Sequence, residues 1–205
     1  LAAQSWALRL SDLQESYRLA SQLLEMSENR GYEFGIADAC KTLGYCYWRF
    51  SDFSLSLSQS LRALKIYENL DDQKGEADTL NSIGAVYMFQ EDHRKRLEVN
   101  LRCQELRRQI GDLEGVASSE GNIGETYFEM GEYQKARQCF ENCLVDSHAS
   151  PQGRSWAYHN LGKVATVEKD YPLALDFFNK GLELSISVNY GVLIVDSYLR
   201  ITEVY

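Results

Sequence analysis

The chain has 205 residues, of which 44% are hydrophobic and 25% are charged, so it is long and apolar enough to bury a sizeable core. Its formal net charge of −9 argues against nucleic acid or an anionic membrane surface as the main partner, because both bind cationic faces. No apolar run approaches the roughly 18 residues of a membrane span, and the first ten residues lack the basic start and apolar stretch of a signal peptide.

Composition predicts an all-α chain. Proline occurs twice, at Pro151 and Pro172, whereas the helix-forming residues Leu, Ala, Glu, Arg and Gln are abundant. The five cysteines are an odd number without the spacing of a disulfide framework, so we expect reduced thiols and a cytoplasmic protein. The sequence contains no phosphate-binding loop, HExxH or GxSxG motif, and we expect neither a catalytic site nor a bound metal or cofactor.

A repeat of about 40 residues runs through the chain, and three independent markers define it. Each marker recurs at the same interval, which shortens slightly only before the last repeat. The first is a glycine within a Leu/Ile-Gly pair, at Gly44, Gly84, Gly124 and Gly162. The second is a carboxylate ahead of an apolar stretch, at Asp52, Asp92, Glu132 and Asp170. The third is a glycine assigned to a linker, at Gly35, Gly75, Gly115 and Gly153.

Apolar residues within each repeat recur with a period of about 3.6, which predicts a helix A, a tight turn and a helix B. In chain order, B helices are expected near 12–28, 52–70, 92–110, 132–146 and 170–187, and A helices near 36–50, 76–90, 116–130 and 154–168. The domain prediction is a single solenoid over 1–205, with a partial repeat at 1–30, repeats at about 35–70, 75–110, 115–148 and 153–188, and a partial repeat at 191–205. Residues 192–205 resemble another A helix, in which 201–205 echo Ile83–Tyr87, so we expect the natural protein to continue beyond Tyr205 with a partner helix B.

The recurring residues have a physical reason for their positions. Carboxylates at the starts of the B helices can accept hydrogen bonds from free amides there and oppose the positive end of the helix dipole. The glycines of the first marker are expected where helices A and B cross closely, because a side chain would collide there. Ala63, Cys103 and Cys143 occupy the matching small positions of the B helices, which predicts buried cysteines without chemistry.

These residues resemble the tetratricopeptide repeat. The unit that fits best carries Ile123, Gly124, Tyr127, Tyr133, Ala136, Phe140 and Cys143. The resemblance implies an all-α superhelix of antiparallel helix pairs, an α-solenoid of about five repeats, with a concave groove lined by the A helices. The long period and the loop Ile110–Gly115 are similar to the longer subclass of this repeat, found in a scaffold that links G-protein α subunits to the mitotic spindle and in regulatory segments of bacterial signalling proteins.

Family positions carried onto this sequence imply a set of groove residues. They are Lys41, Tyr45, Trp48, Arg49, Asn81, Met88, Phe89, Asn122, Glu125, Phe128, Trp156, His159 and Lys163. Trp48, Met88, Phe89 and Phe128 would form an apolar strip that suits an amphipathic helix or an extended apolar peptide. In peptide-binding members of the family, asparagines on this helix bond the ligand backbone. A clamp for a chaperone's terminal carboxylate is not expected, because the lysines and arginines of the set are scattered among glutamates.

Alternatives remain open for this strip. The aromatic residues could pack between neighbouring A helices, or the groove could hold the protein's own flanking domain or a second copy in a homodimer. The sequence therefore predicts a non-catalytic protein–protein interaction module, bound by a protein or peptide, that regulates or scaffolds a larger signalling protein. The competing prediction comes from Gly44–Asp52, which resembles repeats that precede bacterial output domains: a regulatory or dimerisation segment of a diguanylate or adenylate cyclase or of a kinase.

Overall fold

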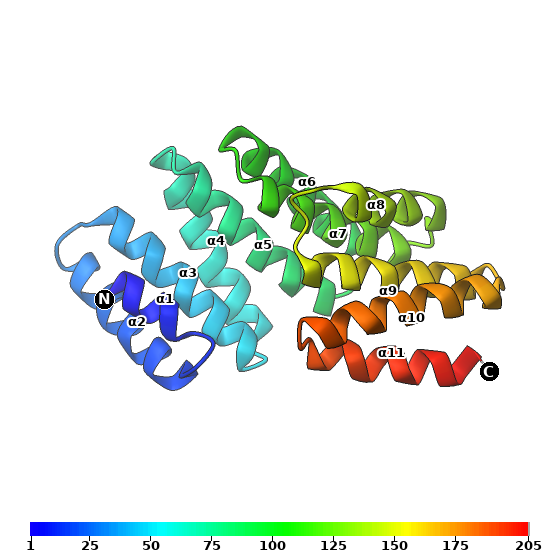
Figure 1. Ribbon diagram of the computed structural model, residues 1–205. Coiled ribbons are helices and arrows are strands. Elements are labelled where there is room, and N and C mark those ends of the chain that lie inside the picture. Colours follow the sequence, from blue (N-terminus) through cyan, green and yellow to red (C-terminus); the bar gives the residue numbers. More distant parts are fainter. Residues whose placement is uncertain (205) are drawn as a thin grey trace. The chain divides into compact units, whose positions relative to one another are not determined.

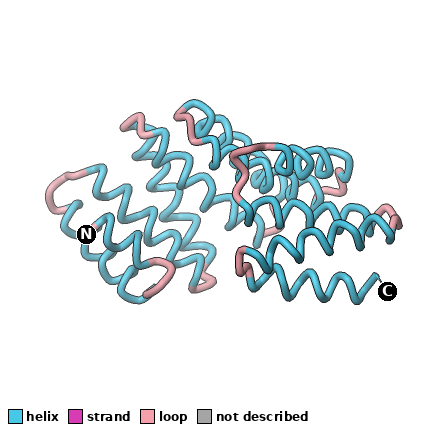
Figure 2. Tube along the Cα trace, viewed as in Figure 1, coloured by secondary structure: helices cyan, strands magenta, loops and turns pink. Residues whose placement is uncertain are grey.

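The computed structural model describes residues 1–204 of the chain, so Tyr205 of the last partial repeat lies outside the described residues. Within that range the chain is a succession of helices joined by short turns (Figures 1 and 2). The helices are α1 (Ala2–Leu8), α2 (Leu13–Glu28), α3 (Glu33–Arg49), α4 (Phe53–Asn69), α5 (Gln73–Phe89), α6 (His93–Gln109), α7 (Leu113–Glu129), α8 (Tyr133–Val145), α9 (Pro151–Val167), α10 (Tyr171–Ser187) and α11 (Gly191–Val204). The all-α class and the organisation into about five antiparallel helix pairs are confirmed.

The chain forms two compact units, an N-terminal unit of residues Leu1–Ile110 and a C-terminal unit of residues Gly111–Tyr205. In each unit every helix packs against the next one along the chain. The odd-numbered helices also contact each other, α3 touching α1 and α5 in the N-terminal unit, and α9 touching α7 and α11 in the C-terminal unit. Each unit is therefore two layered, with an inner row of odd-numbered helices that corresponds to the predicted A helices. The prediction of one continuous solenoid over 1–205 stays a prediction.

The turns recur at half the sequence period. Residues in the left-handed backbone region follow the helices at Gly31, Ser51, Asp71, Glu91, Gly111 and Gly131, and again at Lys169 and Asn189. Neighbouring turns are half a repeat apart from Gly31 to Gly131 and from Lys169 to Asn189. A left-handed residue after the last helical turn reverses the chain and satisfies free carbonyls there. Each repeat is thus built from two similar halves. The α8–α9 connection departs from this pattern, because Asp146 there is extended and Ser150 caps α9.

The predicted caps at the B helices are confirmed with one exception. Asp52, Asp92 and Asp170 each accept a hydrogen bond from the backbone amide three residues on. Glu132 makes no such bond, so this part of the prediction is wrong. Its longer side chain instead reaches Lys135, with 3.4 Å between Oε2 and Nζ.

The glycines assigned to linkers lie inside helices, which corrects the predicted starts of the A helices. α5 begins at Gln73 and not near residue 76, because Asp72 caps it by accepting a hydrogen bond from the Gly75 amide at 3.0 Å. Gly75 is buried in the first turn, where an added Cβ would lie 2.4 Å from the ring of Tyr67. The glycine therefore admits a packed tyrosine from the preceding helix. It is a packing residue and does not mark a flexible connection.

The glycines of the Leu/Ile-Gly pairs lie at close helix crossings, as predicted. An added Cβ would lie 2.7 Å from the ring of Phe140 at Gly124 and 2.6 Å from the ring of Phe178 at Gly162. Both rings are almost completely buried, so neither can move aside. These two contacts fix the α7–α8 and α9–α10 pairs, and thereby the inner face on which the candidate site lies.

Candidate functional site

Two adjoining hollows open on the inner face of the C-terminal unit, among α7, α9 and α11. The first hollow has a volume of about 420 Å³ and is lined by Glu125, Trp156, His159, Asn160, Lys163, Tyr190, Val192, Leu193, Val195, Asp196 and Leu199. The second has a volume of about 340 Å³ and is lined by Phe128, Glu129, Lys163, Thr166, Val167, Phe178, Arg200 and Glu203. Lys163 lines both hollows, so we treat them as one groove.

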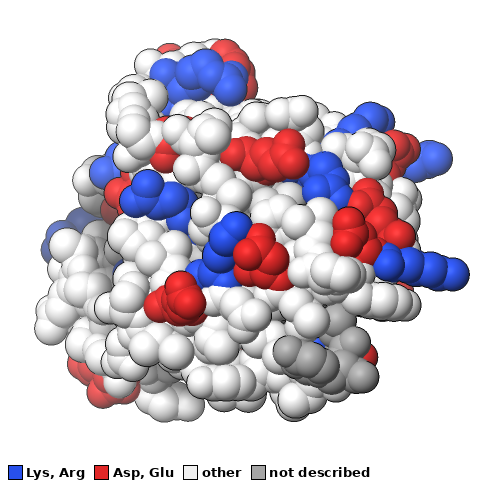
Figure 3. Space-filling view, turned by 45° about the vertical axis from the view of Figure 1, so that its right-hand side comes forward, with Lys and Arg blue, Asp and Glu red and all other residues white. Residues whose placement is uncertain are grey.

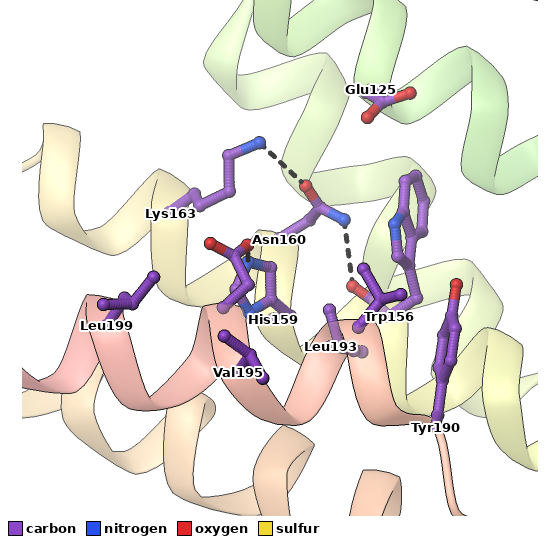
Figure 4. A pocket seen from close by; sticks show the side chains of 11 residues that line it. Glu125, Trp156, His159, Asn160, Lys163, Tyr190, Leu193, Val195 and Leu199 are labelled. Atoms are coloured by element: carbon purple, nitrogen blue, oxygen red, sulfur yellow. Dashed lines mark hydrogen bonds and ion pairs between the residues drawn. The ribbon is translucent and has the colours of Figure 1, made fainter.

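One face of α9 supplies the middle of the groove. Trp156, Asn160 and Lys163 are spaced i, i+4 and i+7, which places them on the same side of a helix. Asn160 donates a hydrogen bond to the backbone carbonyl of Trp156 at 2.9 Å and accepts one from Lys163 Nζ at 3.2 Å (Figure 4). The indole of Trp156 packs edge-on against Phe140. The polar centre of the groove is therefore held in place before any ligand arrives.

α11 supplies an exposed aliphatic wall. Val192, Val195 and Leu199 recur at i, i+3 and i+7 on this helix and are 79%, 60% and 56% exposed. Leu193, which also lines the first hollow, is buried. The wall is thus a surface feature that the core of the unit does not require.

His159 is buried beneath this wall. Its Nε2 lies 2.8 Å from Asp196 Oδ2 and its Nδ1 lies 3.2 Å from the Ser197 hydroxyl, both on α11. Burial lowers the pKa of the imidazole to about 4, against the opposing effect of Asp196, so the ring is neutral at pH 7. Nδ1 shares a hydrogen bond with the Ser197 hydroxyl, while Nε2 lies against the Asp196 carboxylate. Because both ring nitrogens are engaged by α11, His159 joins two helices and does not offer a base to a ligand.

The charges of the groove are arranged around Lys163. Its ammonium lies 4.6 Å from the centre of the Phe128 ring, within cation–π distance. Arg200 is paired with Glu203 at 3.0 Å and lies 3.6 Å from Asp196. Figure 3, in which the right-hand side of Figure 1 comes forward, shows acidic and basic side chains next to each other in small groups, with uncharged surface between the groups.

The inner face of the N-terminal unit carries a row of aromatic rings. Trp6, Tyr45, Trp48, Phe89 and Phe53 follow one another with ring centres 6.0, 5.7, 6.0 and 4.9 Å apart. Three cations accompany the row, with Arg9 and Lys41 over the Trp6 ring and Arg49 bonded to the Tyr45 hydroxyl. Offset rings of this kind stabilise each other and leave edges and faces for a partner.

Sequence reasoning missed Trp6 because the first repeat is one residue out of register. In the first two helix pairs a buried serine of helix B donates to a carbonyl of helix A, Ser16 to Ser5 and Ser56 to Gly44. The serines are one full repeat apart, but the carbonyls that they bond are one residue closer together, because carbonyl and serine are 11 positions apart in the first pair and 12 in the second. Trp6 therefore takes the inner position directly after the bonded carbonyl, which a strict shift by one repeat assigns to the core.

The structure divides the predicted groove residues between the two units. Lys41, Tyr45, Trp48, Arg49 and Phe89 belong to the aromatic row or its cations. Asn81 and Met88 are half-buried on α5 and belong to no ring contact of the row. Glu125, Phe128, Trp156, His159 and Lys163 come together around the two hollows. Asn122, half-buried on α7, lines neither hollow. Their role in binding stays a prediction.

The α11 side of the groove was also absent from the predicted site. The sequence could have indicated it, since residues 201–205 identify this segment as an A helix. A shift of one full repeat from the predicted groove residue His159 leads to Leu199. Asn160 was recognised as an asparagine beside the repeat glycine, and it now lines the first hollow.

The cysteines, the strongest nucleophiles of the chain, lie in the core. All five cysteines are buried, and burial raises the pKa of Cys139 and of Cys143 to about 12, which keeps both as thiols. Among residues 1–204, no three side chains of the types His, Cys, Asp and Glu gather closely enough to hold a metal ion. No helix in the described part of the chain is both long and apolar enough to cross a membrane. What the groove offers is noncovalent contact: an aliphatic wall, aromatic faces and a central cation.

Comparisons with known proteins agree with the helical pairs. A family model described as the tetratricopeptide repeat matches residues 75–144 and 116–187, which together cover more than half of the chain. A comparison with curated protein sequences gives no match. Among solved structures, BtubC (BKLC) from P. vanneervenii is similar with a TM-score of 0.74 and 16% identity over 95% of this chain and 84% of that chain.

Two Rap structures are similar as well. The apo form of RapI has a TM-score of 0.73 and 19% identity over 97% of this chain and 80% of that chain. A Rap protein complexed with competence and sporulation factor has a TM-score of 0.78 and 17% identity over 97% of this chain and 60% of that chain. At these identities the likeness shows the fold alone.

Proposed function

The chain belongs to the tetratricopeptide repeat family, and from this premise we propose that it is a non-catalytic protein–protein interaction module. Its partner is a peptide or helix that binds the inner face of the C-terminal unit, in the groove between α7, α9 and α11. The aromatic row of the N-terminal unit is a further contact surface for the same class of partner. Aromatic side chains and arginine are common anchors of such contacts.

The observation that carries the proposal is the exposed wall of α11 above a polar centre. Val192, Val195 and Leu199 are more than half exposed although they border a groove that also contains Trp156. Exposed apolar surface in a concavity is favourable to cover, and a few fixed polar groups give a ligand its orientation. Asn160 and Lys163 are such groups, because their hydrogen bond already orients them.

We extend the proposal to a regulatory or scaffolding role in a larger signalling protein within the cytoplasm. The subclass resemblance of the loop Ile110–Gly115 supports this role, and the buried free thiols fit a reducing compartment. The Rap protein complexed with competence and sporulation factor offers a precedent for a fold of this kind that binds a partner.

The proposal predicts that Val195→Glu weakens binding to the groove. Immobilised protein is used to select from a displayed library of random peptides of about 12 residues, long enough to cross the three helices. The affinity of the enriched peptides is then measured by fluorescence anisotropy. We expect at least about tenfold weaker binding by Val195→Glu, because a carboxylate then faces the apolar ligand in place of a methyl group.

The matched control is Ile186→Glu, which introduces the same charge at a residue of α10 that is 53% exposed and borders neither hollow. It is expected to bind like the wild-type chain. Failure of the wild-type chain to enrich any peptide, or equal loss in both variants, would contradict a binding site in this groove.

A further inference from the structure

We infer that the groove recognises a segment with an acidic side chain between two apolar ones, and that the acidic side chain pairs with Lys163. This inference rests on the proposed function and specifies its partner. The structural basis is the position of Lys163, whose side chain forms the boundary between two hollows with apolar linings.

The ammonium of Lys163 is held but not neutralised. Asn160 Oδ1 accepts a hydrogen bond from Lys163 Nζ at 3.2 Å (Figure 4). The centre of the Phe128 ring lies 4.6 Å from the same nitrogen. Among residues 1–204, no carboxylate oxygen of its own unit lies within ion-pair distance of Nζ. A ligand that covers the groove would remove water from this cation, and removal of water from an unpaired charge is costly. A carboxylate on the ligand compensates for that cost.

The other charged groups that line the groove have less need of a charged partner on the ligand. Arg200 pairs with Glu203, and Asp196 lies against His159 and Arg200. Glu125 is engaged in an interaction as well. Glu129 is exposed, so water can continue to solvate it when a ligand is bound. Lys163 is therefore the charge at which recognition is decided.

Apolar surface lies on both sides of this cation. The first hollow offers Trp156 and the aliphatic wall of α11. The second offers Phe128 and Val167. A segment that runs along α9 from the first hollow to the second thus meets apolar surface, then a cation, then apolar surface again, which gives the order of side chains that fits.

The test is a charge reversal carried out with the full chain. Peptides are selected as above on the wild-type chain and, separately, on Lys163→Glu. We expect wild-type selection to enrich Asp or Glu flanked by apolar residues, and Lys163→Glu to enrich Lys or Arg at the same place. For one wild-type peptide, replacement of its acidic residue by lysine should weaken binding to the wild-type chain about tenfold and restore it with Lys163→Glu.

Two controls define what carries the effect. Lys180→Glu makes the same change in net charge on α10, outside both hollows, and should retain the wild-type preference. Amidation of the peptide's C-terminus should leave affinity unchanged, because we assign the carboxylate to a side chain within the segment. Loss of affinity on amidation would assign it to the chain terminus and overturn the inference.

The outcomes separate the inference from the proposed function. Peptides that bind in the groove without an acidic preference, or a preference that Lys163→Glu does not reverse, overturn the inference and leave the proposed function standing. Failure to select any peptide overturns both. A dimer in sedimentation that Val195→Glu dissociates would make a second copy the occupant of the groove and would also overturn the inference.

Discussion

Replacing Phe178 by alanine is expected to lower the free energy of unfolding by about 3–5 kcal/mol, the usual cost of removing a buried phenylalanine ring. The ring is 1% exposed and packs among Ala165, Ala174 and the backbone at Gly162. Its loss leaves a cavity at the crossing of α9 and α10 that the two helices cannot close without losing their register. Urea denaturation followed by circular dichroism measures the change.

Tyr171→Ala is the control on the same helix. Tyr171 is 47% exposed, so its truncation should cost less than about 1 kcal/mol. A second comparison tests the crossing itself. Gly162→Ala should destabilise the wild-type chain more than it destabilises Phe178→Ala, since the added Cβ collides with the ring. Equal costs of Gly162→Ala in both backgrounds would show that the glycine does not act through Phe178.

Acidification from pH 7 to pH 4 is expected to remove about 3 kcal/mol of stability through His159 alone, at about 1.36 kcal/mol for each pH unit by which its pKa is lowered. Burial lowers the folded-state pKa to about 4, while in the unfolded chain the imidazole titrates near its ordinary value of 6.5. The unfolded state therefore binds a proton first as the pH falls through 6.5. This contribution is complete above pH 6.5 and is lost progressively towards pH 4.

The groups that face His159 are Asp196, Lys163 and Arg200, of which Asp196 opposes the shift and the two cations support it. His159→Gln keeps a hydrogen-bonding side chain without a titrating group in this range. Urea midpoints measured at pH 7, 6, 5 and 4 should fall more steeply for the wild-type chain than for the variant. Parallel pH dependences would show that His159 does not link α9 and α11 as a buried neutral ring.

The spacing of glycines and carboxylates was enough to predict the helix pairs, because the same close crossing recurs in each repeat. Gly124 and Gly162 lie against aromatic rings as the pattern requires, and Asp52 caps α4. The residues at which the A helices begin were harder to predict from the sequence. Gly75 is typical of a turn in sequence, but the Asp72 cap on its amide and its close contact with Tyr67 place it in the first turn of a helix.

The residues of the candidate site could be predicted from the sequence only in part. Positions carried over from the repeat include Trp156 and Lys163, which a helix places on one side and which line the first hollow. They do not reveal that His159 is buried by α11, because the burial of a polar residue depends on the partner that a neighbouring helix presents. Trp6 was missed because carbonyl and serine are one position closer in the first helix pair than in the second, and a shift of one position moves a side chain from the core to the inner face.

The most direct test of a groove that binds peptides is NMR spectroscopy of the isotope-labelled chain during titration with a selected peptide. The account predicts that the amide shifts of α9 and α11 around Lys163, Val195 and Leu199 change most, with the side-chain signal of the Trp156 indole among them. Changes confined to the outer faces of α8 and α10, with no change around Lys163, would contradict it.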